Sequence, residues 1–206
     1  MALDINKIDF NKNADGLVPV VVQENDTLQV LMLGYMNQEA VNETLQSKKV
    51  TFYSRTKQRL WVKGETSENY LMLNDIHLDC DNDTILVMAT PCGPTCHTGD
   101  ISCFGKEYSP ALSKIGMMDK VIRDRIANPT DGSYTNQLIK RGLNKVSQKV
   151  GEEAVEVVIA ALAETDAEYI GEMTDLLYHS LVLLHAKKLE LSDIAEIIDK
   201  RHQAMK

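Results

Sequence analysis

The chain has 206 residues, of which 44% are apolar and 25% charged, as is ordinary for a soluble globular protein of one or two domains. The formal net charge is −8, and residues 1–105 carry 8 basic and 14 acidic side chains while residues 106–206 carry 14 and 16, so neither half has the basic surface of a nucleic-acid-binding protein. The sequence contains no run of 18 apolar residues, so no membrane span is predicted and we expect no membrane partner. The first ten residues do not resemble a secretory signal, so we expect a cytoplasmic location.

Short runs rich in Val, Ile, Tyr and Phe predict that the first half is mainly β. Clusters of Asn, Asp, Gly and Lys separate these runs, as is typical of strands. The runs are LVPVVVQ (17–23), LQVLML (28–33), VTFYS (50–54), LWVK (60–63), residues 70–78 and TILVMAT (84–90). One helix is expected at Asn37–Ser47 with Asn37 as its N-cap, which makes this half an α+β domain.

The apolar pattern changes period in the second half. From Leu112 onward, apolar residues recur at three- and four-residue steps, which predicts helices. The expected helices cover residues 112–127, 134–149, 150–164, 167–187 and 192–205. We therefore predict two domains: a mainly β domain over residues 1–105 and an all-α helical bundle over residues 117–206, joined by a linker at residues 106–116.

Three aspartates follow the strand predicted at residues 70–78. Residues 79–83 read Asp-Cys-Asp-Asn-Asp, and if they continue a strand, Asp79, Asp81 and Asp83 point to one side because side chains alternate. Carboxylates this close repel one another unless a cation lies among them, and oxygen ligands suit Mg²⁺. Such a run is equally typical of a solvated turn, so both interpretations stay open at this point.

All four cysteines lie within 24 residues, and in a reducing compartment this favours metal binding over disulfides. Thiolates from Cys80, Cys96 and Cys103 would leave the fourth position of a tetrahedral zinc ion open, which is typical of a catalytic site. With Cys92 as a fourth ligand the zinc would instead be structural, and the spacing does not choose between the two. His97, beside a ligand, is either a proton shuttle or an ordinary loop residue.

Five spaced blocks of the first half resemble phosphoribosyl-AMP cyclohydrolase. The blocks are GLVPVVVQ (16–23), VLMLGYMNQEA (30–40), FYSRTKQRLWVKGETSEN (52–69), DCDND (79–83) and GPTCHTG with SCF (93–104), and the resemblance covers residues 15–104. A joint match of five blocks is specific and favours the catalytic zinc. The family usually has glycine where this chain has Glu68, so a different turn is expected there. Cys92 is not a ligand in the family, and we expect it to be a small buried residue.

This resemblance implies a zinc ion held by Cys80, Cys96 and Cys103, with ligands drawn from two subunits of a homodimer, and Mg²⁺ near the three aspartates. It implies that a zinc-activated water attacks the adenine ring of phosphoribosyl-AMP and opens the N1–C6 bond, with His97 moving protons. The expected contacts to substrate phosphates are basic residues that are otherwise simply solvated, namely Arg55, Lys57 and Lys63. Trp61 is expected either to stack on the base or to lie in the core.

Carboxylates also gather on two predicted helices. Glu152, Glu153 and Glu156 lie at one end of an otherwise apolar helix, and Glu172 and Asp175 are three residues apart in a second one. Like charges at these spacings destabilise an isolated helix, and bound Mg²⁺ would remove the conflict. The two clusters can meet if the second helix begins well before Glu172. Otherwise they are acidic residues of the kind that helix N-termini favour.

The pair of motifs E-x-x-E and E-x-x-D resembles the all-α nucleotide pyrophosphohydrolases. QKVGEEAVE (148–156) with EMTDLLYHSLVLL (172–184) is similar to phosphoribosyl-ATP pyrophosphohydrolase in particular, over about residues 117–203. The resemblance implies Mg²⁺ held by Glu153, Glu156, Glu172 and Asp175, with Glu152 supporting them or activating the water that attacks the α-phosphorus. Three basic residues at four-residue spacing either bind phosphates or form a solvated stripe: Arg141, Lys145 and Lys149.

The two implied activities are consecutive, because the second half makes phosphoribosyl-AMP and the first half opens its ring. We therefore predict a bifunctional hydrolase of histidine biosynthesis that uses Zn²⁺ and Mg²⁺, takes small nucleotide substrates and forms a homodimer with active sites at the interface. Two alternatives remain. One is a house-cleaning nucleoside-triphosphate pyrophosphohydrolase fused to a zinc-binding domain, and the other is a zinc-stapled interaction module without turnover.

Overall fold

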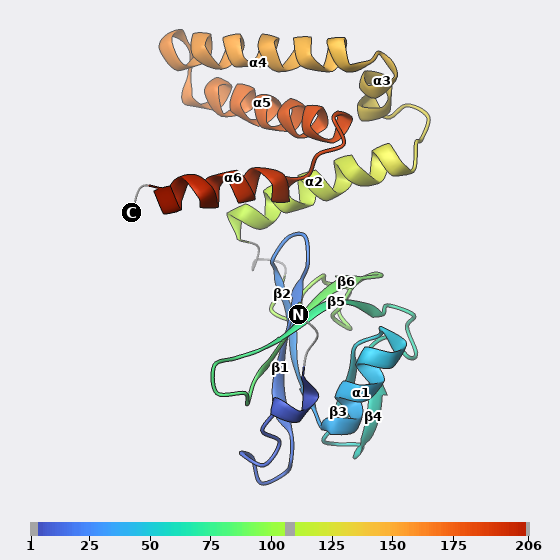
Figure 1. The fold of residues 1–206 in the computed structure, drawn as a ribbon. Coiled ribbons are helices and arrows are strands. Elements are labelled where there is room, and N and C mark those ends of the chain that lie inside the picture. Colours follow the sequence, from blue (N-terminus) through green and yellow to red (C-terminus); the bar gives the residue numbers. More distant parts are fainter. Residues whose placement is uncertain (1–3, 106–109, 205–206) are drawn as a thin grey trace. The chain divides into compact units, whose positions relative to one another are not determined.

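The computed structural model describes residues 4–105 and 110–204, and it divides the chain into two compact units (Figure 1). The N-terminal unit runs from Met1 to Met117 and the C-terminal unit from Met118 to Lys206. Residues 106–109 of the expected linker lie outside the described residues, and helix α2 (Ala111–Ala127) begins within the rest of it. None of the described helices is both long and apolar enough to cross a bilayer.

Two sheets and one α-helix form the body of the N-terminal unit. The four-stranded sheet has the order β2-β1-β6-β5, in which β1 and β6 are parallel and the other neighbours antiparallel. Strands β3 and β4 form a separate hairpin. The bounds are η1 Ile5–Lys7, β1 Val18–Glu24, β2 Val30–Met36, α1 Gln38–Ser47, β3 Thr51–Ser54, β4 Arg59–Val62, β5 Leu71–Leu78 and β6 Ile85–Pro91. The α+β fold expected from the sequence is confirmed.

The core of this unit follows from alternation along its strands. Val18, Val20 and Val22 of β1 are fully buried, whereas the residues between them are only partly so, because neighbouring side chains of a strand point to opposite faces. Phe52 of β3 is 1% exposed and belongs to the same cluster of buried residues. Asn37 caps α1 as predicted, since its side-chain oxygen accepts a hydrogen bond from the amide of Ala40 at 2.8 Å.

The C-terminal unit is entirely helical among its described residues, which confirms the predicted helical bundle (Figure 1). Its other helices are α3 Tyr134–Lys140, α4 Leu143–Ala163, α5 Asp166–Ala186 and α6 Leu191–Ala204. The predicted break between residues 149 and 150 is wrong, because α4 runs through it. The chain breaks earlier, at Gly142, whose φ of +84° lies in the left-handed region that glycine adopts without a steric penalty. The core of the unit is Ile122, Leu138, Val146, Leu181 and Val182.

Thr165 fixes where α5 begins. Its side chain accepts a hydrogen bond from the amide of Glu168, and the Glu168 carboxylate accepts one from the amide of Thr165 at 2.9 Å. This capping box starts α5 at Asp166, two turns before Glu172. Glu172 therefore lies inside the helix rather than at its first turn, as the predicted meeting of the two carboxylate clusters requires.

Candidate functional site

A cavity of about 460 Å³ in the N-terminal unit brings two of the predicted zinc ligands together. Cys96 and Cys103 line it, and so does His97, whose Nδ1 lies 3.8 Å from the Cys96 sulfur. The main-chain amide of Cys96 donates to the Asp100 carbonyl at 2.9 Å, and that of Cys103 donates to the Leu31 carbonyl at 2.8 Å. These hydrogen bonds fix the main chain at both cysteines, which lie in the loop that follows β6.

The two thiols and Lys63 influence one another's protonation. Hydrogen bonds from Thr98 lower the pKa of Cys96, whereas burial raises the pKa of Cys103. Burial also lowers the pKa of Lys63, which is only 7% exposed and donates to the Asn69 carbonyl at 3.3 Å. The positive charge of Lys63 opposes the effect of burial at Cys103, and thiolates are the species that bind zinc.

Cys80 does not line this cavity, and it is exposed in the turn that follows β5. Over the described residues, no group of three potential ligand atoms includes a cysteine. One chain therefore brings together two of the three predicted zinc ligands. Cys92 is exposed, so the expectation that it is a small buried residue is wrong. Its place after β6 is held by the backbone, since its amide donates to the Tyr70 carbonyl at 2.9 Å.

The three aspartates form a cluster on a turn rather than on a strand. Their carboxylate oxygens lie within 4.8 Å of one another, although β5 ends at Leu78. Asp79 accepts hydrogen bonds from the amides of Asp83 and Thr84 at 3.0 and 3.1 Å, which closes the turn. The Lys12 ammonium lies among the carboxylates and pairs with Asp81 at 2.5 Å and with Asp83. These contacts raise the pKa of Lys12 and lower the pKa values of Asp81 and Asp83.

The predicted substrate-binding residues of this unit fall in different places. Trp61 and Lys63 line the thiol cavity, and the Trp61 ring also packs against Phe52 with a centroid separation of 5.8 Å. Arg55 instead lies over the ring of Tyr35 at 3.8 Å and lines a different cavity. Lys57 is exposed in the β3–β4 turn. Of the three basic residues expected to contact phosphates, the structure places one beside the thiols.

Sequence reasoning missed the turn at residues 64–69 and Thr95 as walls of the thiol cavity. Thr95 is 4% exposed and its hydroxyl has no hydrogen-bond partner among the described residues. Gly64 has a φ of +93°, and the turn closes with a hydrogen bond from the Glu68 amide to the Gly64 carbonyl at 2.8 Å. Glu68 has a φ of +61°, a conformation that suits glycine. Glutamate at this position therefore adopts a glycine-like backbone.

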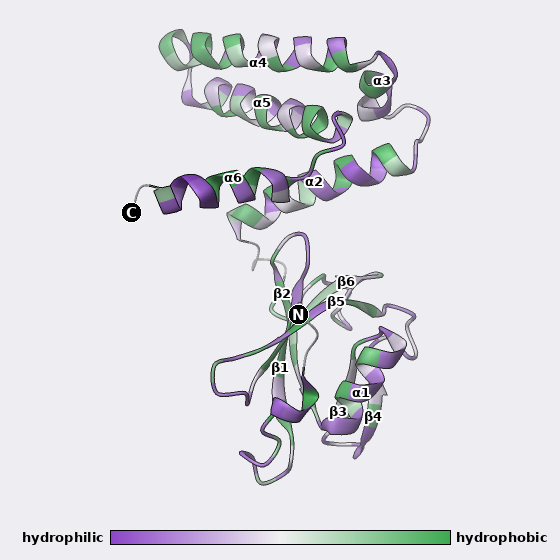
Figure 2. Cartoon of the chain, viewed as in Figure 1, coloured by the Kyte–Doolittle hydropathy of each residue, from purple (hydrophilic) through white to green (hydrophobic). Residues whose placement is uncertain are grey.

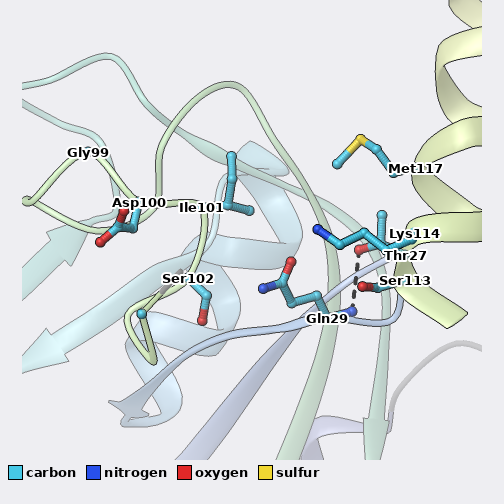
Figure 3. Close-up of a pocket in the computed structure, with 10 residues that line it drawn as sticks. Thr27, Gln29, Gly99, Asp100, Ile101, Ser102, Ser113, Lys114 and Met117 are labelled. Atoms are coloured by element: carbon cyan, nitrogen blue, oxygen red, sulfur yellow. Dashed lines mark hydrogen bonds between the residues drawn. The ribbon is translucent and has the colours of Figure 1, made fainter. Parts of the chain in front are cut away.

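A second cavity in the N-terminal unit, of about 230 Å³, is lined in part by Thr27, Gln29 and Ser102 (Figure 3). The main-chain amide of Gln29 donates to the Thr27 hydroxyl at 3.3 Å. None of the cysteines or aspartates predicted to bind metal lines this cavity, so it is not part of the candidate site.

The C-terminal unit brings the predicted carboxylates of α4 and α5 together. Oxygens of Glu153, Glu156 and Glu172 lie within 4.8 Å of one another, and Glu153 is 4% exposed. Asp175 and Glu153 both line a cavity of about 430 Å³. The hydrogen bond with Glu153 raises the pKa of Glu156, as expected when two carboxylates share a proton. A group of carboxylates this close together could hold a divalent cation.

Lysine side chains neutralise part of this acidic cluster. Lys149 pairs with Glu153 at 2.5 Å and with Glu152 at 3.2 Å, and Lys145 lies 3.8 Å from Glu152. Burial is the largest influence on Glu153 and acts to raise its pKa, but the contacts with Lys149, His179 and Glu156 together outweigh burial and the pKa is lowered. Arg141 does not line the cavity; it forms the C-cap of α3.

The same cavity contains four side chains that the sequence did not indicate: Arg125, Tyr134, Tyr178 and His179. His179 is 4% exposed and lies one helical turn beyond Asp175 on α5, so a four-residue step along the motif would have pointed to it. Tyr134 and Arg125 come from other helices, and only the packing of the unit brings them to the cavity.

Two family models match consecutive parts of the chain. The phosphoribosyl-AMP cyclohydrolase model matches residues 32–105, and the phosphoribosyl-ATP pyrophosphohydrolase model matches residues 116–202. Proteins described as "Histidine biosynthesis bifunctional protein HisIE" are similar over nearly the whole chain. The protein from Photobacterium profundum is 51% identical over 96% of this chain and 98% of its own length. Those from Staphylococcus epidermidis and Campylobacter jejuni are both 49% identical, over 95% and 96% of this chain and 91% and 96% of their own lengths.

Matches of this extent cover both units, in the order in which their folds were expected from the sequence. The chain therefore belongs to the family of bifunctional histidine-biosynthesis enzymes, in which a phosphoribosyl-AMP cyclohydrolase is joined to a phosphoribosyl-ATP pyrophosphohydrolase.

Proposed function

We propose that the chain hydrolyses phosphoribosyl-ATP at the α4–α5 carboxylates and opens the adenine ring of the resulting phosphoribosyl-AMP at the thiol cavity. The observation that carries this proposal is that a cavity in each unit is bordered by side chains of a kind that can bind metal ions. Thiols border the cavity in the unit that matches the cyclohydrolase, and carboxylates border the one in the unit that matches the pyrophosphohydrolase.

Zinc fits the thiol cavity through Cys96 and Cys103 of one chain and the partner subunit's Cys80. Two thiols side by side, with a third exposed elsewhere on the same chain, support a site shared between two copies. Bound zinc supplies a Lewis acid that makes water nucleophilic at neutral pH. His97 is placed to carry the proton that the leaving ring nitrogen needs, Trp61 offers an apolar wall for the base, and Lys63 offers a positive charge for the phosphate.

The three aspartates of the 79–83 turn fit a magnesium ion. The Lys12 ammonium group among them supports this, because it shows that the turn attracts a cation. Magnesium at this position would take over the neutralising role of Lys12.

In the helical unit, magnesium would be held by Glu153, Glu156, Glu172 and Asp175, and would offset the charge on the triphosphate and on the departing pyrophosphate. Glu152 borders the cluster and is free to accept a proton from the attacking water once Lys149 turns towards a phosphate. Lys145 and Lys149 already lie at the carboxylates, which supports their role as phosphate ligands.

A second copy of the chain is the partner that we propose for both units. In addition to the shared thiol site, α4 and α5 expose large apolar side chains, among them Val155, Val158, Leu162 and Ile170, which are 57–83% exposed. Figure 2 shows the ribbon at the C-terminal end of α4 in the colour of hydrophobic residues. Faces of this kind mark interaction surfaces. The exposed apolar side chains support a homodimer, which we place in the cytoplasm as part of the proposal.

Two single substitutions test the proposal on the full-length chain. With phosphoribosyl-ATP, Mg²⁺ and Zn²⁺ supplied, Cys96→Ala should release pyrophosphate normally and accumulate phosphoribosyl-AMP. Glu153→Gln should stop pyrophosphate release and still open the ring of added phosphoribosyl-AMP. The matched controls are Cys92→Ala and Glu164→Gln, which alter an exposed cysteine and an exposed glutamate that line neither cavity.

The two-site proposal is wrong if either test variant loses both activities while it remains folded. Ordinary ATP serves as a comparison substrate. Faster hydrolysis of ATP than of phosphoribosyl-ATP would favour the house-cleaning alternative, and folding with zinc but without any turnover would favour the interaction module.

A further inference from the structure

The cavity beside the α4–α5 carboxylates has a wall built from aromatic and imidazole groups, to which neither the sequence motifs nor the proposed chemistry assigns a role. Tyr134 at the start of α3 forms this wall together with Tyr178 and His179 on α5. His179 is buried, whereas Tyr134 is 48% exposed. A large aromatic side chain that is anchored at its tip and open to a cavity is suited to contacting a ligand.

The hydrogen bonds of this wall have a fixed direction. Nδ1 of His179 lies 2.9 Å from the main-chain oxygen of Asp175, and because a carbonyl oxygen can only accept, Nδ1 must carry the hydrogen. A carboxylate oxygen of Glu153 lies 3.6 Å from Nδ1 and is also an acceptor. In the neutral ring, Nε2 therefore presents a lone pair, and it lies 3.0 Å from the Tyr134 hydroxyl. Tyr134 accordingly donates its only hydroxyl hydrogen to His179.

The Tyr134 oxygen is held in place by its surroundings. Its ring stacks on Tyr178 with a centroid separation of 6.2 Å, and meets the His179 ring edge-on at 5.9 Å. The Tyr178 hydroxyl bonds to the fully buried Thr135 at 2.7 Å, which ties the start of α3 to α5. Ser133 caps α3 through the amide of Asn136. An oxygen positioned in this way binds without having to be ordered first.

We propose that Tyr134 is a specificity-determining residue of the pyrophosphohydrolase site, where its oxygen accepts a hydrogen bond from a donor group of the nucleotide, and that His179 is the residue that positions it. With its hydrogen committed to His179, this oxygen has only lone pairs to offer the cavity. Phosphate oxygens, which also only accept, are therefore turned away from it and towards Arg125 and Lys149, the cations of the same cavity. The groups that fit Tyr134 are a ribose hydroxyl or an amino group of the base. This assignment rests on the proposed function, in which the carboxylates of this cavity are the catalytic centre.

Tyr134→Phe tests the assignment, because it removes one oxygen and keeps the ring. With phosphoribosyl-ATP as the substrate, we expect KM to rise about tenfold while kcat changes little. An interaction made equally in the bound substrate and in the transition state gives this pattern. The affinity for Mn²⁺, used as a magnetic probe of the carboxylates, should not change. An unchanged KM would overturn the proposal, and so would a loss of kcat together with Mn²⁺ affinity.

Substitutions of His179 test the positioning role. His179→Leu lets the Tyr134 hydroxyl turn its hydrogen towards the cavity, so KM should rise as in Tyr134→Phe. His179→Gln, which offers an acceptor oxygen, should restore most of the affinity. A His179→Leu variant that binds Mn²⁺ and substrate normally would overturn this part.

Analogues of phosphoribosyl-ATP that lack one ribose hydroxyl at a time identify the donor. The analogue that lacks the partner hydroxyl should be hydrolysed equally well by the wild-type protein and by Tyr134→Phe. If every such analogue keeps the tenfold difference, the donor is a nitrogen of the base. If the proposed function is wrong, the Glu153→Gln variant keeps wild-type activity. That result does not depend on Tyr134.

Discussion

Replacing Gly64 by alanine is expected to destabilise the N-terminal unit, because the position carries two separate constraints. Its φ of +93° lies in the left-handed region that side chains rarely adopt. An added Cβ would also lie 2.6 Å from the carbonyl carbon and oxygen of Asn69 and from the amide nitrogen of Tyr70. These are backbone atoms on the opposite arm of a closed turn, so they cannot rotate away as the end of a side chain can.

The two constraints have different magnitudes, and a matched variant separates them. A left-handed backbone costs about 1–2 kcal/mol for a residue with a Cβ, and overpacking against fixed atoms costs about 1–3 kcal/mol. Alanine also lowers the conformational entropy of the unfolded chain, which offsets about 0.4–1 kcal/mol of the loss in unfolding free energy. We therefore expect Gly64→Ala to lose about 2–4 kcal/mol of unfolding free energy. Gly99→Ala has a similar φ of +88° but no atom within 4 Å of the added Cβ, so it should lose only about 1 kcal/mol.

Urea unfolding followed by tryptophan fluorescence measures this difference. Trp61 is the only tryptophan in the sequence, and it lies in the N-terminal unit, so the signal reports on that unit. With an m-value of about 2 kcal/mol per molar urea, the midpoint should fall by about 1–2 M for Gly64→Ala and by about 0.5 M for Gly99→Ala. Equal shifts for the two variants would refute the reasoning, because the steric contact would then contribute nothing.

Three further predictions concern the same unit. Glu68→Gly should stabilise it by about 0.5–1 kcal/mol, because glycine adopts the φ of +61° without strain; urea unfolding measures this. Lys12→Met should tighten Mg²⁺ binding by about two- to fivefold in calorimetry, since an exposed ammonium group no longer has to leave Asp81. Arg59 lowers the pKa of Glu65, so their ion pair stabilises the protein above the ordinary glutamate pKa and stops doing so as the pH falls through the lowered value. Arg59→Gln should therefore lower the urea midpoint at pH 7, and the difference from the wild-type protein should shrink as the pH falls through the lowered pKa of Glu65.

Each of these predictions has an outcome that contradicts it. A Glu68→Gly variant with a lower urea midpoint would show that the left-handed backbone is not the dominant cost at that position. Unchanged magnesium affinity in Lys12→Met would mean that the ammonium group does not compete with the metal. A midpoint difference in Arg59→Gln that persists at low pH would assign the effect to packing rather than to charge.

Much of the fold was predictable because it depends on local pattern. The Val-rich run at residues 17–23, bounded by polar clusters, predicts β1, and the three- and four-residue steps after Leu112 predict the helices. The one misplaced helix break has a local cause as well. Apolar periodicity continues across residues 134–164, and the backbone freedom of Gly142, rather than any change of pattern, ends α3 and lets α4 begin.

The carboxylate cluster of the helical unit was predictable in part. The spacing of Glu153 and Glu156 places them on one helix face, and the start of α5 before Glu172 brings the second motif alongside. Lys149, which its four-residue spacing predicted either to bind phosphates or to be solvated, lies at the cluster. Arg141 shared its four-residue spacing, but α3 ends there, so the continuous helical face on which that inference depended does not exist.

What the sequence determined by itself is the chemistry and the order of the chain: thiols and aspartates in a β unit, then paired carboxylates on helices, each in a motif specific enough to identify its family. Tertiary structure alone decided which groups share a cavity. Cys96 and Cys103 meet while Cys80 stays apart, and Tyr134 reaches His179 across 45 residues. The reason is physical: helical and strand periods fix which side chains share a face over a few residues, whereas contacts between distant segments depend on how those faces pack.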